Sequence, residues 1–215
     1  MNKEGFSRAP KETSSDDWET PPEVVKALES FLDVEFTLDA CGTEKNKKAP
    51  KVFTKETNGL LQSWKEELVF VNPPYSHVKE WSMKCSFEHD EAVLHNRRCL
   101  IALLIPARTE TKYFHDYCYH AQYFLLCKGR INFLVDGKPF YYKEVVDKKT
   151  GLKVIDPKTG KPLLKKVMSV SNFPSIVVLW VNNIGIHFDR ELVSFDYKKY
   201  VKSNDKKIYK QIKII

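Results

Sequence analysis

The most constraining feature of the sequence is an unbroken apolar run over Cys99–Ala107. This run is too short to cross a membrane as a helix, which takes about 18 apolar residues or more. It is apolar at every position rather than at every second one, so both faces of the strand that it forms must be covered. Such strands lie inside parallel sheets that carry helices on both sides. The run therefore predicts an α/β fold.

Helical and extended segments alternate around this strand. A first helix is expected to begin with Thr20 as its cap and to carry Val24 to Leu32 on one face. Further helices are predicted over 77–95 and 111–120. The expected strands are 35–40, 51–54, 67–71, 99–106, 122–126, 131–135 and 176–181. This β-α-β order with a β-rich end indicates a mostly parallel sheet.

The length of 215 residues indicates one domain with appendages. We expect a loose N-terminal segment over 1–17, a main domain over 18–197 and a Lys-rich tail over 198–215. The stretch 140–171 interrupts the alternation. It carries two turn patterns, Asp147-Lys-Lys-Thr-Gly151 and Asp156-Pro-Lys-Thr-Gly160, and is predicted to form an inserted basic β-hairpin. The alternative is a surface loop without a role.

Cysteine usage and the N-terminus predict a reducing, cytoplasmic setting. The five cysteines form no C-x-x-C pair, and their odd number does not suit a disulfide framework. The N-terminal stretch has no apolar core of the kind a secretory signal needs, and no membrane partner is expected. Cys85, His89, His95 and Cys99 are spaced superficially like zinc ligands, but His95 would point away from Cys85 and His89 on one helix, so we expect no metal. The oligomeric state stays open.

Positive charge is concentrated in two appendages. The formal net charge is +7, with eight lysines and three acidic residues over 141–166 and seven lysines and one acid over 198–215. The remaining chain is therefore acidic. Basic appendages suit a polyanionic partner, because neutralised phosphates release counterions. A solvated lysine-rich surface is the alternative.

The tetrapeptide Asn72-Pro73-Pro74-Tyr75 directly follows the apolar strand 68–71. Proline cannot continue a central strand, so the chain must turn at its carboxyl end. Ligands of open α/β sheets bind at that edge. Asp39 ends another predicted strand there, and the alternative role for it is to cap the loop that follows.

The tetrapeptide suits chemistry on a planar exocyclic amine. Two prolines fix the backbone and remove two donors, which leaves the Pro73 carbonyl and the Asn72 side-chain oxygen as acceptors, with the Tyr75 ring beside them. The lone pair of such an amine is delocalised into its ring. Two acceptors draw the amine hydrogens out of the plane and localise the lone pair toward an electrophile. This predicts catalysis by orientation and dipoles rather than by a covalent intermediate.

Six blocks in chain order resemble the phage-type Dam family of DNA N6-adenine methyltransferases. The resemblance covers about residues 16–135 and resumes at 173–180. Its blocks are Asp17-Trp-Glu-Thr-Pro21, Leu38-Asp-Ala-Cys-Gly42, Asn58-Gly-Leu60 with Trp64, Val71-Asn-Pro-Pro-Tyr-Ser76, Ile105-Pro-Ala-Arg-Thr109 with Phe114-His-Asp116, and Lys128-Gly-Arg-Ile-Asn-Phe133. It implies a Rossmann-like S-adenosylmethionine-dependent methyltransferase fold, with an antiparallel strand near the end of the sheet. Adenine in double-stranded DNA would be the methyl acceptor, reached by base flipping.

The resemblance also implies site residues. Asn72, Pro73, Pro74 and Tyr75 match the catalytic motif. The matches to cofactor-binding positions are Trp18, Thr20, Pro21, Asp39, Ala40, Cys41, Asn58 and Asn72. Packing is an alternative role for Trp18. The residue that would contact the cofactor ribose stays open.

Basic residues near the predicted edge are candidate DNA contacts. They are Arg108, Arg130, Lys148, Lys149 and Lys153. A structural ion pair is the alternative for Arg108, and an edge-strand charge for Arg130. The same Asn-Pro-Pro-Tyr motif also serves methyltransferases of cytosine N4, RNA bases and protein glutamine. A DNA-binding protein with a decayed methyltransferase fold is a further alternative.

Overall fold

The apolar run forms β4 (Cys99–Pro106), the middle strand of a seven-stranded sheet, and every one of its residues is buried. The computed structural model describes Asp16 and residues 18–202. The other strands of this sheet are β1 (Leu38–Asp39), β2 (Lys51–Val52), β3 (Leu68–Val71), β5 (Tyr123–Cys127), β8 (Ser175–Asn182) and β9 (Leu192–Phe195). Their spatial order is β2-β1-β3-β4-β8-β5-β9.

The sheet is mixed but largely parallel, as the sequence predicts. β1, β2, β3 and β4 pair in parallel, and β5 pairs in parallel with β9. β8 pairs antiparallel with both β4 and β5, so it is the one strand of this sheet that runs against the others in the described part of the chain. The carboxyl ends of β1, β3, β4, β5 and β9 consequently meet at one edge, which we call the carboxyl edge.

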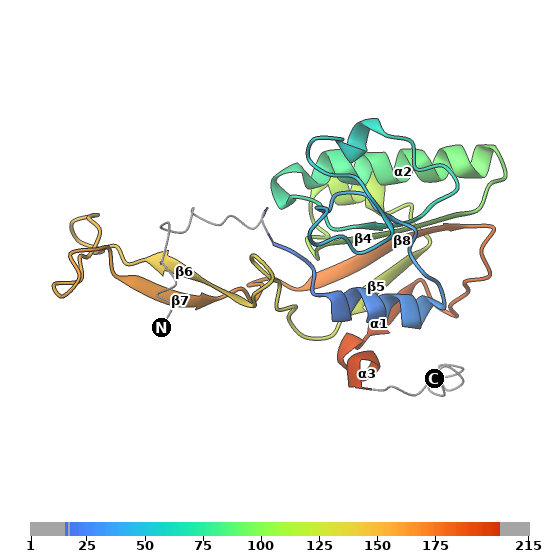
Figure 1. Ribbon diagram of the computed structural model, residues 1–215. Coiled ribbons are helices and arrows are strands. Elements are labelled where there is room, and N and C mark those ends of the chain that lie inside the picture. Colours follow the sequence, from blue (N-terminus) through green and yellow to red (C-terminus); the bar gives the residue numbers. More distant parts are fainter. Residues whose placement is uncertain (1–15, 17, 203–215) are drawn as a thin grey trace, which may run out of the picture.

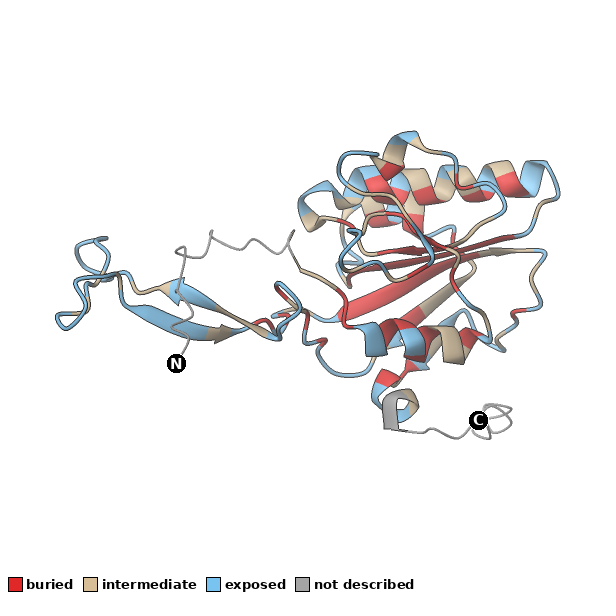
Figure 2. Ribbon diagram, viewed as in Figure 1, coloured by how far each residue is buried: buried red, intermediate tan, exposed pale blue. Residues whose placement is uncertain are grey.

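Helices cover both faces of the sheet (Figure 1). α1 (Pro22–Leu32) packs on one face with Leu100, Ala102 and Leu104 of β4, whereas α2 (Val78–Leu94) packs on the other with Ile101 and Leu103. Successive β4 residues thus serve opposite cores, and burying each such side chain contributes roughly 1.5–3 kcal/mol. Figure 2 shows the buried residues along the sheet and the inner sides of these helices. The predicted two-sided burial is confirmed.

Several predicted boundaries are wrong. The N-cap of α1 is Pro21, with Pro22 as the first helical residue, so Thr20 does not cap this helix. Residues 131–135 form isolated bridges rather than a strand, because they pair briefly with Val170 and Lys138. The predicted helix 111–120 is one π-helical segment, η4 (Phe114–Cys118). The strand β9 was not predicted at all.

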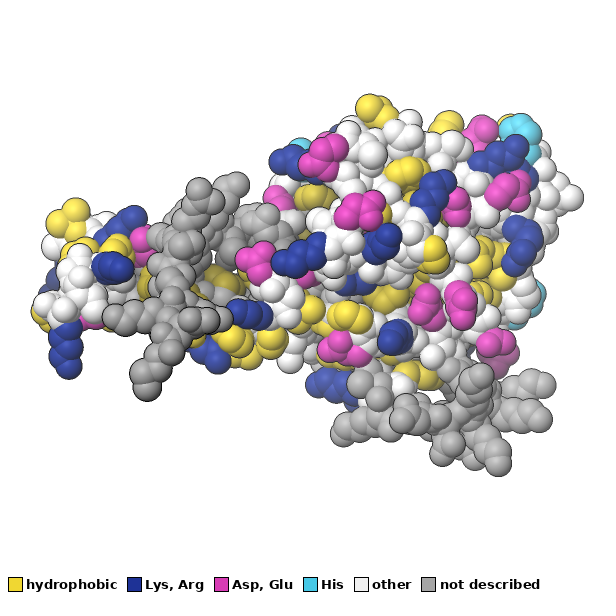
Figure 3. All heavy atoms as spheres, in the orientation of Figure 1, with side chains coloured by type: hydrophobic (Ala, Val, Ile, Leu, Met, Phe, Trp, Pro, Cys, Tyr) yellow, Lys and Arg dark blue, Asp and Glu magenta, His cyan; other side chains and the backbone are white. Residues whose placement is uncertain are grey.

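An arm (residues 136–171) extends from the body of the molecule (Figure 1). Within it β6 (Phe140–Glu144) pairs antiparallel with β7 (Leu164–Met168), in the region where the sequence predicts an insertion. Figure 3 shows lysine or arginine side chains alongside apolar ones on the arm.

The chain ends differ in what the structure describes. The expected loose segment 1–17 lies outside the described residues except for Asp16. The first residues of the expected tail belong to α3 (Tyr197–Lys202), which lies beside α1, and the rest of the tail is outside the described residues. None of the helices in the described residues is both long and apolar enough to span a bilayer.

Candidate active site

The carboxyl edge brings Asp39 and Asn72 to neighbouring strand ends. Asp39 is the last residue of β1 and Asn72 directly follows β3, and β1 and β3 pair in parallel. The Ala40 amide donates to the Phe70 carbonyl at 3.0 Å, so the segment after β1 remains hydrogen-bonded to β3. The sequence prediction that both residues lie at one edge is therefore confirmed.

The Asn72 side chain is held by a segment far away in the sequence. Its Nδ2 donates to the main-chain oxygen of Trp18 at 3.2 Å, and its Oδ1 accepts from the Tyr75 hydroxyl at 3.3 Å. The carbonyl of Trp18 can only accept, so it fixes which end of the amide is the donor. The acceptor end of Asn72 is thereby turned toward Tyr75.

The two prolines and the turn after them set the main-chain acceptors. Pro73 is buried and Pro74 precedes the 3-10 turn η3 (Tyr75–His77). The His77 amide donates to the Pro74 carbonyl at 2.9 Å. In the described part of the chain, this leaves the Pro73 carbonyl as the remaining main-chain acceptor of the pair.

Tyr75 belongs to an aromatic cluster. Its ring meets Phe133 and Phe173 edge-on, with ring centroids 6.4 Å and 5.5 Å apart. Trp18 stacks on the same two phenylalanines at 5.3 Å and 6.0 Å. Burial raises the pKa of the Tyr75 phenol, so the hydroxyl stays neutral and remains a donor. The sequence places Phe133 and Phe173 within the family resemblance but gives no sign that they orient Tyr75.

Asp16 and residues 18–21, before α1, lie across residues 72–75, the candidate catalytic loop, and we call them the strap. The Asp16 carboxylate accepts the Ser76 amide at 2.9 Å, and Glu19 exchanges two main-chain hydrogen bonds with Leu134, at 2.9 Å and 2.8 Å. Together with the Trp18 carbonyl, these contacts hold the strap to both sides of Tyr75. Trp18 is thus a packing residue that also positions Asn72 through its backbone.

Asp39 holds the loop that follows β1. Its carboxylate accepts the Lys48 amide at 3.0 Å and the Cys41 amide at 3.4 Å. Burial raises the pKa of this carboxyl group although both hydrogen bonds oppose the shift. The loop-capping role that the sequence leaves as an alternative is therefore present. Two amides occupy only part of the carboxylate's capacity to accept hydrogen bonds.

Two glycines allow the candidate cofactor segments to touch. A Cβ on Gly42 would overlap the Asp39 carboxylate, and one on Gly59 would overlap the Ala40 carbonyl oxygen. Asn58, just before Gly59, adopts a left-handed conformation with φ of 50°, and its Oδ1 accepts the Leu60 amide at 3.2 Å. Residues 39–42 and 58–59 therefore form one continuous surface.

Replacing Gly59 by alanine should lower the thermal midpoint and weaken cofactor binding, because the new methyl group cannot fit against the main chain of Ala40. Overpacking of this kind costs about 1–3 kcal/mol. Thermal melting and cofactor titration measure both effects. Gly185→Ala is the matched control, because no atom lies within 4 Å of its added Cβ. Equal behaviour of the two variants would contradict the close approach.

The surroundings of this surface fit S-adenosylmethionine. The Thr20 hydroxyl is buried at 2% exposure and has no partner among the described residues. Buried polar atoms are normally satisfied, so an unpaired one at a strap marks a place for a ligand or water atom. The Asn72 main-chain amide faces the Cys41 sulfur, and burial raises the pKa of that thiol, which therefore stays protonated. Cys41 is thus a lining group rather than a nucleophile.

The candidate DNA contacts fall into two groups. Arg108 and Arg130 are exposed in loops after β4 and β5, at the carboxyl edge. Lys148, Lys149 and Lys153 are exposed on the arm, where Lys153 forms an ion pair with Glu144 at 2.7 Å. The structure places the first group at the carboxyl edge and the second group on the arm.

Two turns of the same type form the tip of the arm. Asp147 accepts the Lys149 amide at 2.9 Å, and Asp156 accepts the Lys158 amide at 2.9 Å. In each turn the glycine amide donates back to the aspartate carbonyl, with φ of 71° at Gly151 and 67° at Gly160. Each turn is stabilised by its own hydrogen bonds, so the lysines on it are not needed to stabilise it and can contact a partner.

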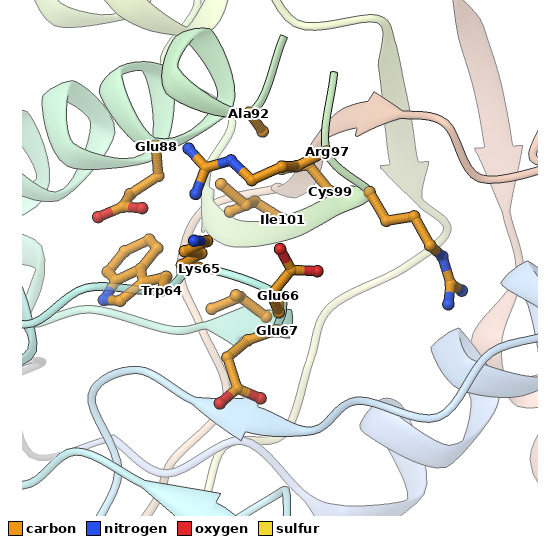
Figure 4. Close-up of a pocket in the computed structure, with 11 residues that line it drawn as sticks. Trp64, Lys65, Glu66, Glu67, Glu88, Ala92, Arg97, Cys99 and Ile101 are labelled. Atoms are coloured by element: carbon orange, nitrogen blue, oxygen red, sulfur yellow. The ribbon is translucent and has the colours of Figure 1, made fainter. Parts of the chain in front are cut away.

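A small cavity lies at the opposite edge of the sheet, where β3 and β4 begin (Figure 4). It holds about 10 Å³ and is lined among others by Trp64, Glu67, Glu88, Arg97 and Cys99. This volume is close to that of a single water site, so the cavity does not accommodate an organic ligand. In the described residues, no group of three or more His, Cys, Asp or Glu side chains is placed to bind a metal.

Comparisons with known proteins agree with this geometry. The family model of DNA N-6-adenine-methyltransferase (Dam) matches residues 7–177. A DNA N-6-adenine-methyltransferase of Haemophilus phage HP1 (strain HP1c1) is 32% identical over 108 residues, which are 50% of this chain and 59% of that protein. One of Escherichia phage T1 is 32% identical over 124 residues, 57% of this chain and 49% of that protein. The alignments thus span about half the length of these relatives. Since the family model covers most of the chain, this protein belongs to the Dam family of DNA N-6-adenine-methyltransferases.

Proposed function

We propose that this chain transfers a methyl group from S-adenosylmethionine to N6 of adenine in double-stranded DNA. The observation that carries the proposal is the Asn72 side chain, held by the Trp18 carbonyl at the carboxyl end of β3 with its oxygen turned toward Tyr75. Family membership supports the reaction class, and both relatives are named DNA N-6-adenine-methyltransferases.

Asn72 and Pro73 act on the target amine as a pair of acceptors. The Asn72 oxygen and the Pro73 carbonyl each accept one N6 hydrogen, so the amine turns out of the plane of the base and its lone pair becomes available. In the free protein the Tyr75 hydroxyl occupies the Asn72 oxygen, and the incoming amine replaces it. Acceptors already fixed by the fold need no reorganisation during the reaction.

Residues on β1 and the strap hold the methyl donor in this proposal. Asp39 accepts from the donor's ammonium group, Thr20 supplies its unpaired hydroxyl, and Ala40, Cys41 and Asn58 line the surface. Trp18 and Pro21 close the strap over it. S-adenosylmethionine supplies a methyl group on a positively charged sulfur, which N6 takes as the S–C bond breaks, and the surplus proton leaves to water.

In this proposal the target adenine must leave the DNA duplex to reach the site. Tyr75 lies within the aromatic cluster at the carboxyl edge, where a stacked, paired base cannot contact it. The target is therefore flipped out of the duplex and stacks on the ring. The arm is our candidate for reading the recognition sequence, because a two-stranded ribbon fits the major groove and this one is rich in lysine.

Shortening the arm should separate DNA binding from cofactor binding. Glu144 and Leu164 face each other in the last pair of the β6–β7 ribbon, so an Asn-Gly turn can replace residues 145–163 and close the ribbon. We expect DNA affinity to fall at least about 10-fold, with unchanged cofactor affinity and thermal midpoint. DNA titration and calorimetry measure these quantities.

The milder variant Lys149→Ala/Lys158→Ala removes one lysine from each copy of the turn and should lose part of the same affinity. Equal loss of DNA and cofactor binding in the shortened protein would assign the arm a folding role instead.

Methylated DNA from cells that express the chain tests the proposed function directly. A chromatogram of digested DNA separates N6-methyladenine from N4-methylcytosine, and sequencing of the methylated positions gives the recognition site. N6-methyladenine that disappears with Asn72→Ala is the expected result. Methylated RNA or protein without methylated DNA would overturn the proposal, and so would a chain that binds no S-adenosylmethionine.

A further inference from the structure

A basic hollow opens at the carboxyl ends of β5 and β9. It is an open depression with room for about 360 Å³ and is lined by Lys128, Gly129, Asp196, Lys198 and Lys199. Lys128 is the first residue after β5, and its amide donates to Phe195, the last residue of β9, at 2.9 Å. Parallel pairing of these two strands therefore places the hollow at the same edge as the candidate active site.

The charges around the hollow favour an anion. Three lysines line it, Arg130 is exposed next to Gly129, and Asp196 is the one acidic lining residue in the described part of the chain. Lys128 pairs with Asp196 at 3.2 Å, while its side chain remains 67% exposed. Figure 3 shows basic side chains beside α3, at the lower edge of the body.

The backbone of the hollow admits a ligand group at close range. Gly129 has φ of 83°, a conformation that side chains rarely adopt, and the nearest atom to a Cβ built there is the Lys198 Nζ at 3.8 Å. A main chain without a side chain can approach a phosphate closely, and the lysine above it supplies the opposite charge.

One short segment connects the hollow to the catalytic loop. Phe133 is the fourth residue after Gly129, a span of at most about 14 Å, and the Phe133 ring centroid lies 6.4 Å from that of Tyr75. The same segment then meets the root of the arm, because the Ser171 amide donates to Ile131 at 3.2 Å. Along this segment the hollow is at most about 20 Å from the Tyr75 ring, and this distance spans about six phosphates of one DNA strand.

We infer that this hollow binds the sugar-phosphate backbone of the target DNA, at the carboxyl edge beside the root of the arm. The inference rests on the proposed function and adds a second, sequence-independent contact to it. Lys128, Lys198 and Lys199 contact phosphates a few nucleotides from the flipped adenine, while the arm reads bases. The duplex is then held by backbone contacts as well as by base contacts.

Charge substitutions of opposite sign test the hollow in the full-length chain. Lys198→Ala/Lys199→Ala should weaken binding of a DNA duplex about 10-fold near physiological salt, and should lower the slope of log K against log salt concentration by about 1.8. Asp196→Asn should strengthen binding, because it removes the acidic residue and frees Lys128. KM for DNA should follow these affinities while kcat at saturating DNA stays unchanged.

The matched control removes two positive charges at the opposite edge. Lys65 and Arg98 are exposed just before β3 and β4, so Lys65→Ala/Arg98→Ala loses the same formal charge far from the hollow. Identical affinity and salt slope in this variant and in Lys198→Ala/Lys199→Ala would overturn the inference. Weaker binding by Asp196→Asn as well would also overturn it.

Different results refute the proposed function and the role of the hollow. A wild-type chain that neither binds nor methylates DNA refutes the proposed function, and the hollow with it. A wild-type chain that methylates adenine through Asn72, combined with hollow variants that behave like the control, refutes the hollow alone.

Discussion

Asn72→Ala should reduce methyl transfer by at least about 100-fold while the affinity for S-adenosylmethionine stays close to that of the wild type. The side chain donates to the Trp18 carbonyl and presents its oxygen beside Tyr75, so alanine removes the acceptor without removing a residue of the cofactor loop. Single-turnover methylation with saturating DNA and cofactor measures the rate of the chemical step, and calorimetry measures the affinity.

A thermal melt separates this effect from unfolding. Asn72 lies at the end of a strand whose last three residues are buried, and the substitution leaves these residues in place. An Asn72→Ala protein that melts like the wild type and still transfers methyl groups at the normal rate would refute the two-acceptor mechanism.

Tyr75→Ala should lower the rate about 5- to 150-fold, whereas Tyr75→Phe should retain most of the activity. Stacking of a base on an aromatic ring is worth about 1–3 kcal/mol, which corresponds to this range. Phenylalanine keeps the ring and its edge-on contacts with Phe133 and Phe173, and it removes only the hydroxyl that occupies Asn72 in the free protein.

Fluorescence of a duplex with 2-aminopurine at the target position reports whether the base leaves the stack. We expect a strong rise with wild type and Tyr75→Phe and a weak one with Tyr75→Ala. An inactive Tyr75→Phe beside an active Tyr75→Ala would show that the hydroxyl matters and the ring does not.

The sequence predicts best those parts that depend on short-range pattern. The continuous apolar run at β4 fixed its burial on both faces, and prolines after β3 required a turn at the carboxyl edge. The sequence therefore predicts the position of the Asn-Pro-Pro-Tyr loop, and the structure confirms it. The predicted helix over 111–120 is present but shorter and largely π-helical, whereas the predicted strand over 131–135 is wrong, because tertiary contacts rather than local periodicity decide the conformation of these residues.

The sequence pattern does not predict contacts between segments that lie far apart along the chain. The bond that orients Asn72 comes from the backbone of Trp18, 54 residues earlier, and a backbone carbonyl leaves no trace in the residue type. The basic hollow joins Lys128 to Lys198 and Lys199 only because β5 and β9 pair. The sequence does not predict β9, so it assigns Lys198 and Lys199 to the Lys-rich tail rather than to a site beside Lys128.

The reversed direction of β8 has a consequence for how such an enzyme can diversify. β5 ends and β8 begins at the carboxyl edge, so everything inserted between them emerges beside the reacting base and returns there. The stability of the core strands depends little on the length of the inserted segment, since extending a loop costs little free energy. In the proposed function, exchanging the arm (residues 136–171) alone is therefore a route to a new target sequence, because Phe133 and Phe173 stay in place beside Tyr75.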